Sequence, residues 1–312
     1  MEIVMPWFKG NIHCHSNESD GRVTAQNAAK FYKFNGYDFI GLSDHNSLTP
    51  VENYADQAGI LGIPCCEFTA AECCHVVGVN MKNPVSPGKE YDSKSIIKGF
   101  SPKESLKIRI LQDGVDKINS DGGIPILCHP FWHWTYDWKI AAAVKNWKFF
   151  EICNASPDCN SYPTPASSPG DEMWDNLLSS GHKVFGVASD DAHEYFSPYN
   201  PHSPCAGKGF IVVKADKLGV KSIVRSIIAG DFYASTGVEL DEYETTHRQI
   251  RIKIKRYGQE IVCFQFFGKN GKELAKTKGL EAVYEIGGSE EYVRCRMASS
   301  AGTYAWTQPV FL

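Results

Sequence analysis

The chain has 312 residues, of which 43% are hydrophobic and 22% are charged, and its formal net charge is -4. These values are typical of a globular protein with a substantial core, and they argue against sequence-independent binding to nucleic acid. No run of about 18 apolar residues occurs, and residues 1–9 are too short and too interrupted by Pro6 for a leader peptide. We therefore expect a cytoplasmic protein with a small-molecule partner, without a nucleic-acid or membrane partner. The oligomeric state is left open.

Cysteine is frequent in this sequence, with eleven residues that mostly lie inside apolar runs. In the absence of a leader, a disulfide framework is not expected, and buried free thiols are the default. Two adjacent pairs, Cys65–Cys66 and Cys73–Cys74, resemble a zinc knuckle at first sight. Zinc loops usually separate the two cysteines by two or more residues, so we do not expect structural zinc at these pairs.

In chain order, the first two-thirds of the sequence alternates short apolar strands with amphipathic helices. Strands are predicted near residues 10–15, 37–45, 63–70, 73–80, 123–130, 149–154, 182–190 and 208–215. Helices are predicted near residues 25–35, 51–59, 102–121, 138–146, 170–180 and 217–230. This alternation favours a mainly parallel sheet or barrel that helices cover.

The pattern changes after about residue 240, where short strands alternate with Gly-rich turns and no helix is predicted. Strands are expected within residues 248–258, 260–271, 281–288 and 291–302, and Asn270-Gly271 is a hairpin turn signal. These features predict a small antiparallel β domain, sandwich-like, beside the larger unit. We therefore divide the chain into domains at residues 1–239 and 240–312.

The segment NIHCHSNESDG, residues 11–21, carries two imidazoles and a carboxylate at the end of the first predicted strand. His13 and His15 are two residues apart, so their side chains leave the same face of a strand about 7 Å apart, which suits a shared cation. Asp20 follows in a turn-rich loop that can return to the same pocket. A pair of surface histidines beside a turn would give the same short motif, so the motif needs partners elsewhere.

Such partners stand at the ends of later strands, where the residues of a βα barrel converge on one face. They are Asp44, His45, Glu67, His75, His129, Glu151, Asp190, Asp191 and His193. Together with the first motif, these positions predict a metal site. Imidazole and carboxylate ligands without thiolate favour zinc, manganese or iron and do not select among them.

As a set, these motifs resemble the polymerase and histidinol phosphatase (PHP) superfamily of metal-dependent phosphoesterases. The resemblance covers residues 11–239 and rests on HCHSNESDG, LSDHNS, Glu67, His75, LCHP and SDDAH. The segments CAGKGFIVVKA and SIIAGDFYASTG and the C-terminal AGTYAWTQPVFL are most similar to the carbaryl hydrolase-like branch. The resemblance implies a distorted seven-stranded (β/α)7 PHP barrel, which is an α/β fold, with a small C-terminal antiparallel β domain.

The resemblance also implies a cluster of two or three divalent metal ions (Zn, Mn or Fe). One metal is expected on His13, His15, Glu67 and Asp191, a second on Glu67, His75 and His129, and a third on Asp20, His45 and His193. Asp191 is preferred because Asp191-Ala192-His193 satisfies the Asp-x-His pattern of the family. Asp190 remains the alternative, and its other expected role is to orient a ligand from behind.

The expected function is that of a metal-dependent hydrolase, most of all a phosphoesterase that cleaves a small phosphomonoester or diester through a metal-bridging hydroxide. The alternative is a carbamate, amide or carboxylic ester hydrolase with the same cluster. Catalytic roles are expected for His193, Glu67 and Asp191, and His193, His133 or His202 would protonate a leaving group. Substrate-binding candidates are Arg22, Glu151, Asn154, His202 and Lys208, and for Glu151 and Asn154 the alternative role is to orient a metal ligand from behind. The loop with Trp132, Trp134 and Tyr136 would form one wall of the pocket.

Overall fold

The structure, a computed structural model, describes residues 5–91, 103–164, 168–196 and 202–312. Its α-helices are α1 (Ala25–Phe34), α2 (Val51–Ala58), α3 (Glu104–Asp121), α4 (Trp138–Ala143), α5 (Pro169–Ser179) and α6 (Val220–Ala229). All six lie where helices are predicted from the sequence, although the predicted start at Pro102 is outside the described residues. Helix α4 ends three residues early because Val144 adopts an extended conformation, with ψ of 143°.

The strands are short and most of them lie in two large sheets. They are β1 (Trp7–Asn11), β2 (Phe39–Ile40), β3 (Leu61–Gly62), β4 (Cys65–Thr69), β5 (His75–Val79), β6 (Ile124–Leu127), β7 (Phe149–Asn154), β8 (Phe185–Ser189), β9 (Phe210–Lys214), β10 (Phe232–Ser235), β11 (Leu240–Thr245), β12 (Gln249–Ile254), β13 (Val262–Gly268), β14 (Lys272–Gly279), β15 (Glu281–Glu285), β16 (Tyr292–Ser299), β17 (Tyr304–Thr307) and β18 (Val310–Phe311). One sheet has the order β4-β5-β6-β7-β8, and a longer one runs β14-β13-β16-β17-β10-β9-β1-β2-β3 with β18 on β16.

Strands β1 and β2 and the five strands β4 to β8 are arranged as an almost closed ring. Isolated parallel bridges join Cys14, beyond β1, to Ala192, beyond β8, and His45, beyond β2, to Glu67 in β4. The predicted mixed α/β class is confirmed. In the described parts of the chain, however, no continuous hydrogen-bonded ladder closes the ring, and β5 runs antiparallel to both β4 and β6. A regular (β/α)7 barrel is therefore not established.

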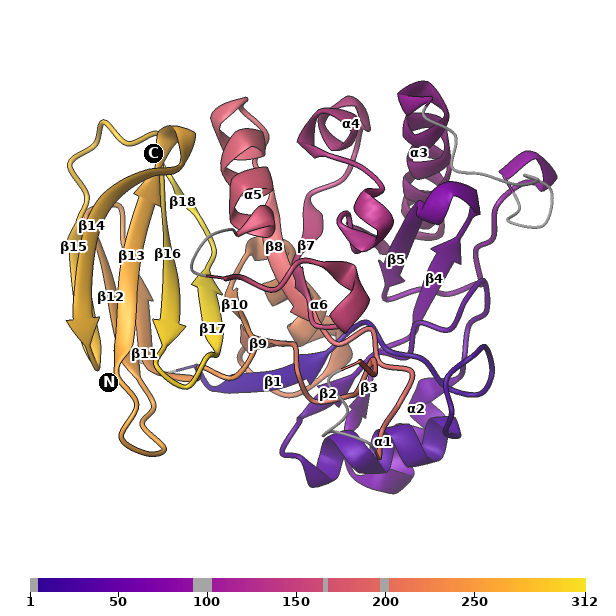
Figure 1. Ribbon diagram of the computed structural model, residues 1–312. Coiled ribbons are helices and arrows are strands. Elements are labelled where there is room, and N and C mark those ends of the chain that lie inside the picture. Colours follow the sequence, from indigo (N-terminus) through magenta and orange to yellow (C-terminus); the bar gives the residue numbers. More distant parts are fainter. Residues whose placement is uncertain (1–4, 92–102, 165–167, 197–201) are drawn as a thin grey trace.

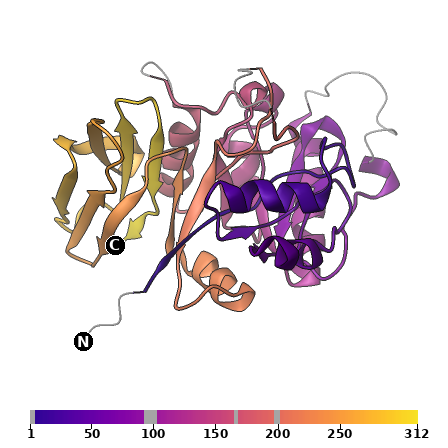
Figure 2. The same ribbon diagram turned by 90° about the horizontal axis from the view of Figure 1, so that it is seen from below.

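Helices α3, α4 and α5 stand side by side along one side of the ring strands (Figure 1). Their apolar residues form a buried cluster with the outer faces of β5 to β8, including Val115, Ile140 and Trp174. Figure 2 shows α6 on another side, beneath β9 and β10 in that view. This helix buries Ile223 and Ile227 against the sheet. The helices therefore cover the outside of the strands and leave one end of the ring to polar side chains.

The C-terminal strands continue the longer sheet. Strand β17 pairs with β10, which pairs with β9, so the last strands of the chain are hydrogen-bonded to the ring side of the molecule. The separate sheet β11-β12-β15 packs on this layer through Ile250, Ile252, Phe264 and Phe266. Asn270-Gly271 forms the predicted hairpin turn between β13 and β14. The proposed domain boundary at 239/240 falls between β10 and β11 and stays a prediction.

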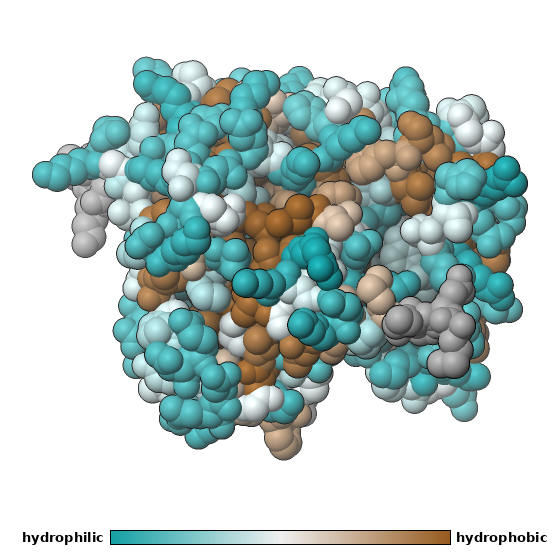
Figure 3. All heavy atoms as spheres, turned by 180° about the vertical axis from the view of Figure 1, so that it is seen from behind, coloured by the Kyte–Doolittle hydropathy of each residue, from teal (hydrophilic) through white to brown (hydrophobic). Residues whose placement is uncertain are grey.

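Hydrophobic residues gather near the middle of the rear face (Figure 3). Elsewhere the surface is largely polar in this view. Among the helices that the structure describes, none is long and apolar enough to cross a bilayer.

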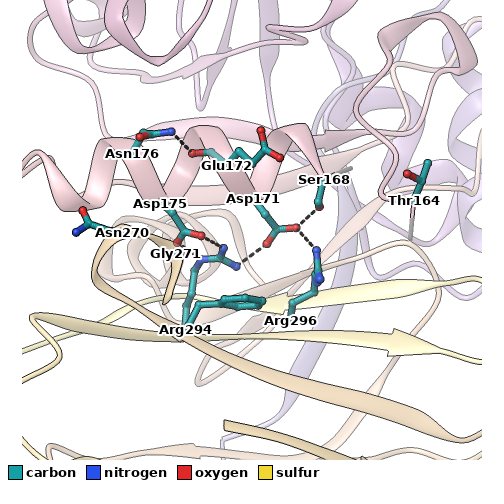
Figure 4. Close-up of a pocket in the computed structure, with 11 residues that line it drawn as sticks. Thr164, Ser168, Asp171, Glu172, Asp175, Asn176, Asn270, Gly271, Arg294 and Arg296 are labelled. Atoms are coloured by element: carbon teal, nitrogen blue, oxygen red, sulfur yellow. Dashed lines mark hydrogen bonds and ion pairs between the residues drawn. The ribbon is translucent and has the colours of Figure 1, made fainter. Parts of the chain in front are cut away.

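A buried network of ion pairs links the C-terminal sheet to α5 (Figure 4). Arg294 of β16 reaches Asp171 with Nη1 and Asp175 with Nη2, each at 2.6 Å. Arg296 adds a contact of 3.1 Å to Asp171. Burial alone would raise the pKa of Asp171, but the two guanidinium groups outweigh burial and hold it below its usual range. Because Arg294 is fully buried, this network is a strong constraint on how the two layers pack.

We expect Arg294→Met to lower the free energy of unfolding by about 3–5 kcal/mol, because the substitution leaves two carboxylates buried without their main partner. Urea unfolding followed by circular dichroism measures the loss. Arg225→Met is the matched control, since Arg225 forms an exposed pair with Asp216, and its cost should stay below about 1 kcal/mol. Equal losses in the two variants would contradict the assigned role.

The same network gives a pH dependence with a defined sign. The pKa of Asp171 is lowered in the folded protein, so its contribution to stability is present above the unfolded pKa, about 3.9, and is lost as the pH falls through the folded value. The difference in the free energy of unfolding between the wild type and Arg294→Met should therefore become smaller as the pH falls into the acid range.

Candidate metal centre

One end of the ring brings together the histidine and acidic residues that the sequence singles out. They are His13 and His15 after β1, His45 after β2, Glu67 in β4, His75 at the start of β5, His129 after β6, and Asp191 and His193 after β8. Asp20 comes from the loop between β1 and α1. Neighbouring strand ends thus supply side chains that are far apart in the sequence.

Glu67 lies at the centre of the cluster and is fully buried. Its Oε1 is 3.1 Å from His75 Nδ1 and 3.2 Å from His129 Nε2. Its Oε2 is 2.7 Å from His45 Nδ1, and His13 and His15 approach the carboxylate to 3.6 Å. One carboxylate therefore faces imidazoles from five positions, as a carboxylate that bridges two cations would.

Asp191 is the second buried carboxylate of the cluster. Its Oδ1 lies 3.2 Å from His13 Nε2 and 3.1 Å from His15 Nε2. Asp190 points elsewhere and accepts hydrogen bonds from Asn11 and Tyr32 and from backbone N–H groups of residues 207–209. Of the two adjacent aspartates, the geometry therefore favours Asp191 as the ligand.

Asp20 lies at the solvent side of the cluster, with a side chain that is 57% exposed. Its carboxylate is 3.4 Å from His45 Nε2 and 3.2 Å from His193 Nε2. The ring of His15 stacks on that of His193 at 4.3 Å between centroids. The outer part of the cluster is thus more accessible than the part around Glu67.

Three groups within the described residues bring their ligand atoms within 4.8 Å of one another. They are His13, Glu67 and His129; His13, His15 and Asp191; and His15, Asp20, His45 and His193. The grouping differs in detail from the expected ligand sets, because His15 also joins the outer group and His75 contacts Glu67 without joining a group. The donor set fits divalent metal ions, whose number and identity it does not fix.

Buried imidazole nitrogens without a hydrogen-bond partner support the fit of the cluster to metal ions. His13 Nε2, His15 Nδ1 and His129 Nδ1 are buried and have no hydrogen-bond partner. Leaving a buried polar atom unsatisfied costs about 1–3 kcal/mol, so several such atoms in one cluster require a compensating partner. Of these three nitrogens, His13 Nε2 faces both carboxylates, and a cation would be such a partner for it.

Behind the cluster, Glu151 and Asn154 hold the ligands in place. Glu151 Oε1 lies 2.6 Å from His13 Nδ1, and its other oxygen accepts the backbone N–H of His129 at 2.7 Å. Asn154 donates to Glu151 at 2.9 Å and to Asp191 Oδ2 at 3.0 Å. Both side chains are buried on the far side of the ligands. This arrangement suits the orientation of metal ligands rather than the substrate contact predicted for these residues.

The electrostatics of the cluster keep its carboxylates ionised. Burial would raise the pKa of Glu67, but the imidazoles of His45, His75 and His13 lower it well below its usual value. Burial would lower the pKa of His45, yet Glu67 and Asp20 raise it to about 10. The negative charge of the carboxylates in the cluster is therefore balanced by the neighbouring imidazoles.

A cavity of about 450 Å³ opens onto the cluster. Of the predicted substrate-binding residues, Arg22 and His202 line it, and Arg22 pairs with Glu194 at 2.8 Å. Lys208 lines a neighbouring cavity instead. The sequence analysis missed Asp158, Cys159 and Glu194 on the wall. In the sequence, the indication that Asp158 and Cys159 could lie near the site was their position a few residues beyond β7.

The aromatic loop contributes one side chain to this wall. Trp132 lies 5.1 Å from the ring of His129 and 5.5 Å from that of His75, and it donates to Asp158 at 3.0 Å. Trp134 is 77% exposed. Tyr136 is buried and donates to the carbonyl oxygen of Cys128. Trp132 is therefore the member of the predicted trio that lines the cavity.

Comparison with solved structures identifies the fold. A two-domain protein from Bacteroides vulgatus, described as containing a predicted PHP-like metal-dependent phosphoesterase, matches 95% of this chain and 91% of its own, with a TM-score of 0.52 and 13% identity. An amidohydrolase from Chromobacterium violaceum matches 59% of this chain and 87% of its own, with a TM-score of 0.39 and 16% identity. A candidate metal-dependent phosphoesterase from Bifidobacterium adolescentis matches 62% and 91%, with a TM-score of 0.42 and 13% identity.

The first of these structures shows that this chain shares the fold of the Bacteroides vulgatus protein along nearly its whole length. None of the three structures bears on the carbaryl hydrolase-like branch. No protein-family model matches the sequence, and no curated protein matches it.

We expect the purified protein to bind a divalent metal and the double variant His13→Ala, His15→Ala to lose it, because the two imidazoles contact both buried carboxylates. Elemental analysis after desalting measures the content. His247→Ala, at an exposed position, is the matched control and should retain the wild-type content. An unchanged metal content in the double variant would rule out this assignment.

Glu151→Gln should weaken zinc binding about 10- to 100-fold, because it removes the charge that orients His13 without removing a ligand. Competition with a chromophoric chelator gives the affinity. Glu52→Gln, at an exposed position of α2, is the control for loss of one negative charge. A loss of equal size in both variants would show that only net charge matters.

Proposed function

We propose that this protein is a metal-dependent hydrolase that cleaves a small phosphomonoester or phosphodiester. The observation that carries the proposal is the buried, Glu67-centred cluster of imidazoles and carboxylates at the base of a 450 Å³ cavity. The shared fold with a protein described as PHP-like and phosphoesterase-containing supports the reaction class. The nearly closed ring is then a distorted PHP-type barrel, and the branch is the carbaryl hydrolase-like one.

Residues of the three groups would hold two or three cations, of zinc, manganese or iron. Bound there, such ions supply Lewis acidity and lower the pKa of a coordinated water. Glu67 and Asp191 fix the inner imidazoles in place, and Glu151 holds His13 from behind. His193 and His202 both line the cavity and are our candidates for protonating the leaving group.

The second candidate function is the hydrolysis of a neutral carbamate, amide or carboxylic ester. The cavity wall favours it in one respect, because Asp20, Asp158 and Glu194 line the same cavity as Arg22, which is itself paired with Glu194. A phosphate group would then depend on bound cations for its neutralisation. A neutral ester or carbamate would not face that requirement.

A substrate panel with metal-loaded protein separates these two functions. We expect release of inorganic phosphate from at least some phosphomonoesters or diesters, with little cleavage of aryl carboxylic esters and carbamates. The double variant His13→Ala, His15→Ala should lose this activity, and His247→Ala should keep it. Cleavage of esters or carbamates with no phosphate release would replace the phosphoesterase proposal by the alternative.

In the same panel, His202→Gln should lower kcat for an alkyl phosphate more than for p-nitrophenyl phosphate, because the better leaving group needs no proton. An equal effect on both substrates would exclude His202 as the proton donor.

A further inference from the structure

A second cavity, of about 620 Å³, lies directly beside the metal cavity. Ser156 lines both cavities. The short turn after Ser156 separates them, because Asp158 and Cys159 face the metal cavity whereas Pro157 and Asn160 face the second one. The two cavities therefore adjoin at Ser156 and the turn that follows it.

The walls of the two cavities differ in charge. The metal cavity contains five carboxylate side chains, namely Asp20, Glu67, Asp158, Asp191 and Glu194. The second cavity is lined by Lys208 and by neutral polar residues that include Asn160, Tyr162 and Thr236. Among the described residues, no carboxylate lines it. The second cavity therefore offers an anionic group a cationic side chain and no opposing carboxylate among its described lining residues.

Lys208 is fixed relative to the metal cluster through the backbone. The buried carboxylate of Asp190 accepts N–H hydrogen bonds from Gly207 at 2.8 Å, from Lys208 at 2.6 Å and from Gly209 at 2.5 Å. Asp190 is next in sequence to Asp191, whose carboxylate faces His13. The loop that carries the ammonium group is thus tied to the same strand end as a predicted metal ligand.

The ammonium group itself keeps donor capacity. Lys208 Nζ donates to the carbonyl oxygen of Ser203 at 3.3 Å, and an ammonium group has three protons to donate. The side chain is half-buried, where a charge-assisted hydrogen bond is screened less than at the surface. Lys208 is therefore placed to bind an anion without a large rearrangement.

We propose that the Lys208 cavity binds an anionic group on the part of the substrate that does not react. The substrate would then carry a carboxylate or a second phosphate a short distance from the ester that is cleaved. This inference rests on the proposed function for the position of the scissile bond, but the binding of an anion to Lys208 is testable without turnover.

Matched pairs of compounds test the proposal by calorimetry and by initial rates. The carboxylate pair is 3-phosphoglycerate and glycerol 3-phosphate, and the phosphate pair is fructose 1,6-bisphosphate and fructose 6-phosphate. In at least one pair, the compound with the additional anion should bind wild-type protein about tenfold or more tightly than its partner. Lys208→Met should remove this preference, and Lys208→Arg should retain most of it. Whichever pair shows the effect identifies the anion.

Lys217→Met, which removes an exposed lysine nearby in the sequence, is the matched control and should preserve the preference. In the rates, the loss in Lys208→Met should appear as a raised KM for the compound with the additional anion. No preference in either pair, or equal losses for both compounds of a pair, would overturn the proposal. If the preference and its loss are seen by calorimetry while no compound is hydrolysed, the anion site stands and the phosphoesterase function fails.

Discussion

The buried carboxylate of Glu67 is the interaction on which the rest of the site depends. Moving a carboxylate out of water costs several kcal/mol, and the folded chain offsets this cost by surrounding Glu67 with imidazoles from several strand ends. The same residue forms the isolated bridge to His45 that links β2 with β4. Glu67 thus contributes to the cluster through its side chain and to the near closure of the ring through its backbone hydrogen bonds with Asp44 and Asn46.

Two of the candidate metal ligands have a strained backbone conformation. His129 and Asp191 have positive φ angles of 27° and 49°, which residues with side chains adopt at a cost of order 1–3 kcal/mol. Both residues contact the cluster, and both backbones are held by neighbours: the N–H of His129 donates to Glu151, and that of Asp191 donates to the carbonyl oxygen of His13. The surrounding hydrogen bonds thus hold ligand side chains in conformations that a regular strand would not give.

Much of this arrangement could be predicted from the sequence, because its signals are local. The helices, most of the apolar strands and the polar residues at the strand ends follow from the spacing of apolar residues along the chain. Six strands were not predicted, namely β3, β10, β11, β14, β17 and β18. Of these, β11 and β14 have mostly exposed residues without apolar alternation, and they are positioned by pairing with β12 and β13. For Glu151 and Asn154, the sequence left open whether they orient a metal ligand or contact the substrate. Both belong to β7, and only the packing of the strand ends decides that they lie behind the candidate ligands.

The adjacent residues Asp190 and Asp191 show why the choice between them had to wait for the structure. The sequence presents two equivalent carboxylates at one strand end, and the Asp-x-His pattern favours only one of them. In the fold they diverge: Asp191 faces the imidazoles, and Asp190 faces the N–H groups of residues 207–209. A carboxylate that accepts several N–H groups is satisfied without a cation, whereas Asp191 faces imidazoles whose nitrogens are partly unpartnered. The two adjacent aspartates therefore have different roles. Because Asp190 binds the backbone of residues 207–209, the position of the Lys208 loop depends on the same strand end as the candidate ligand Asp191.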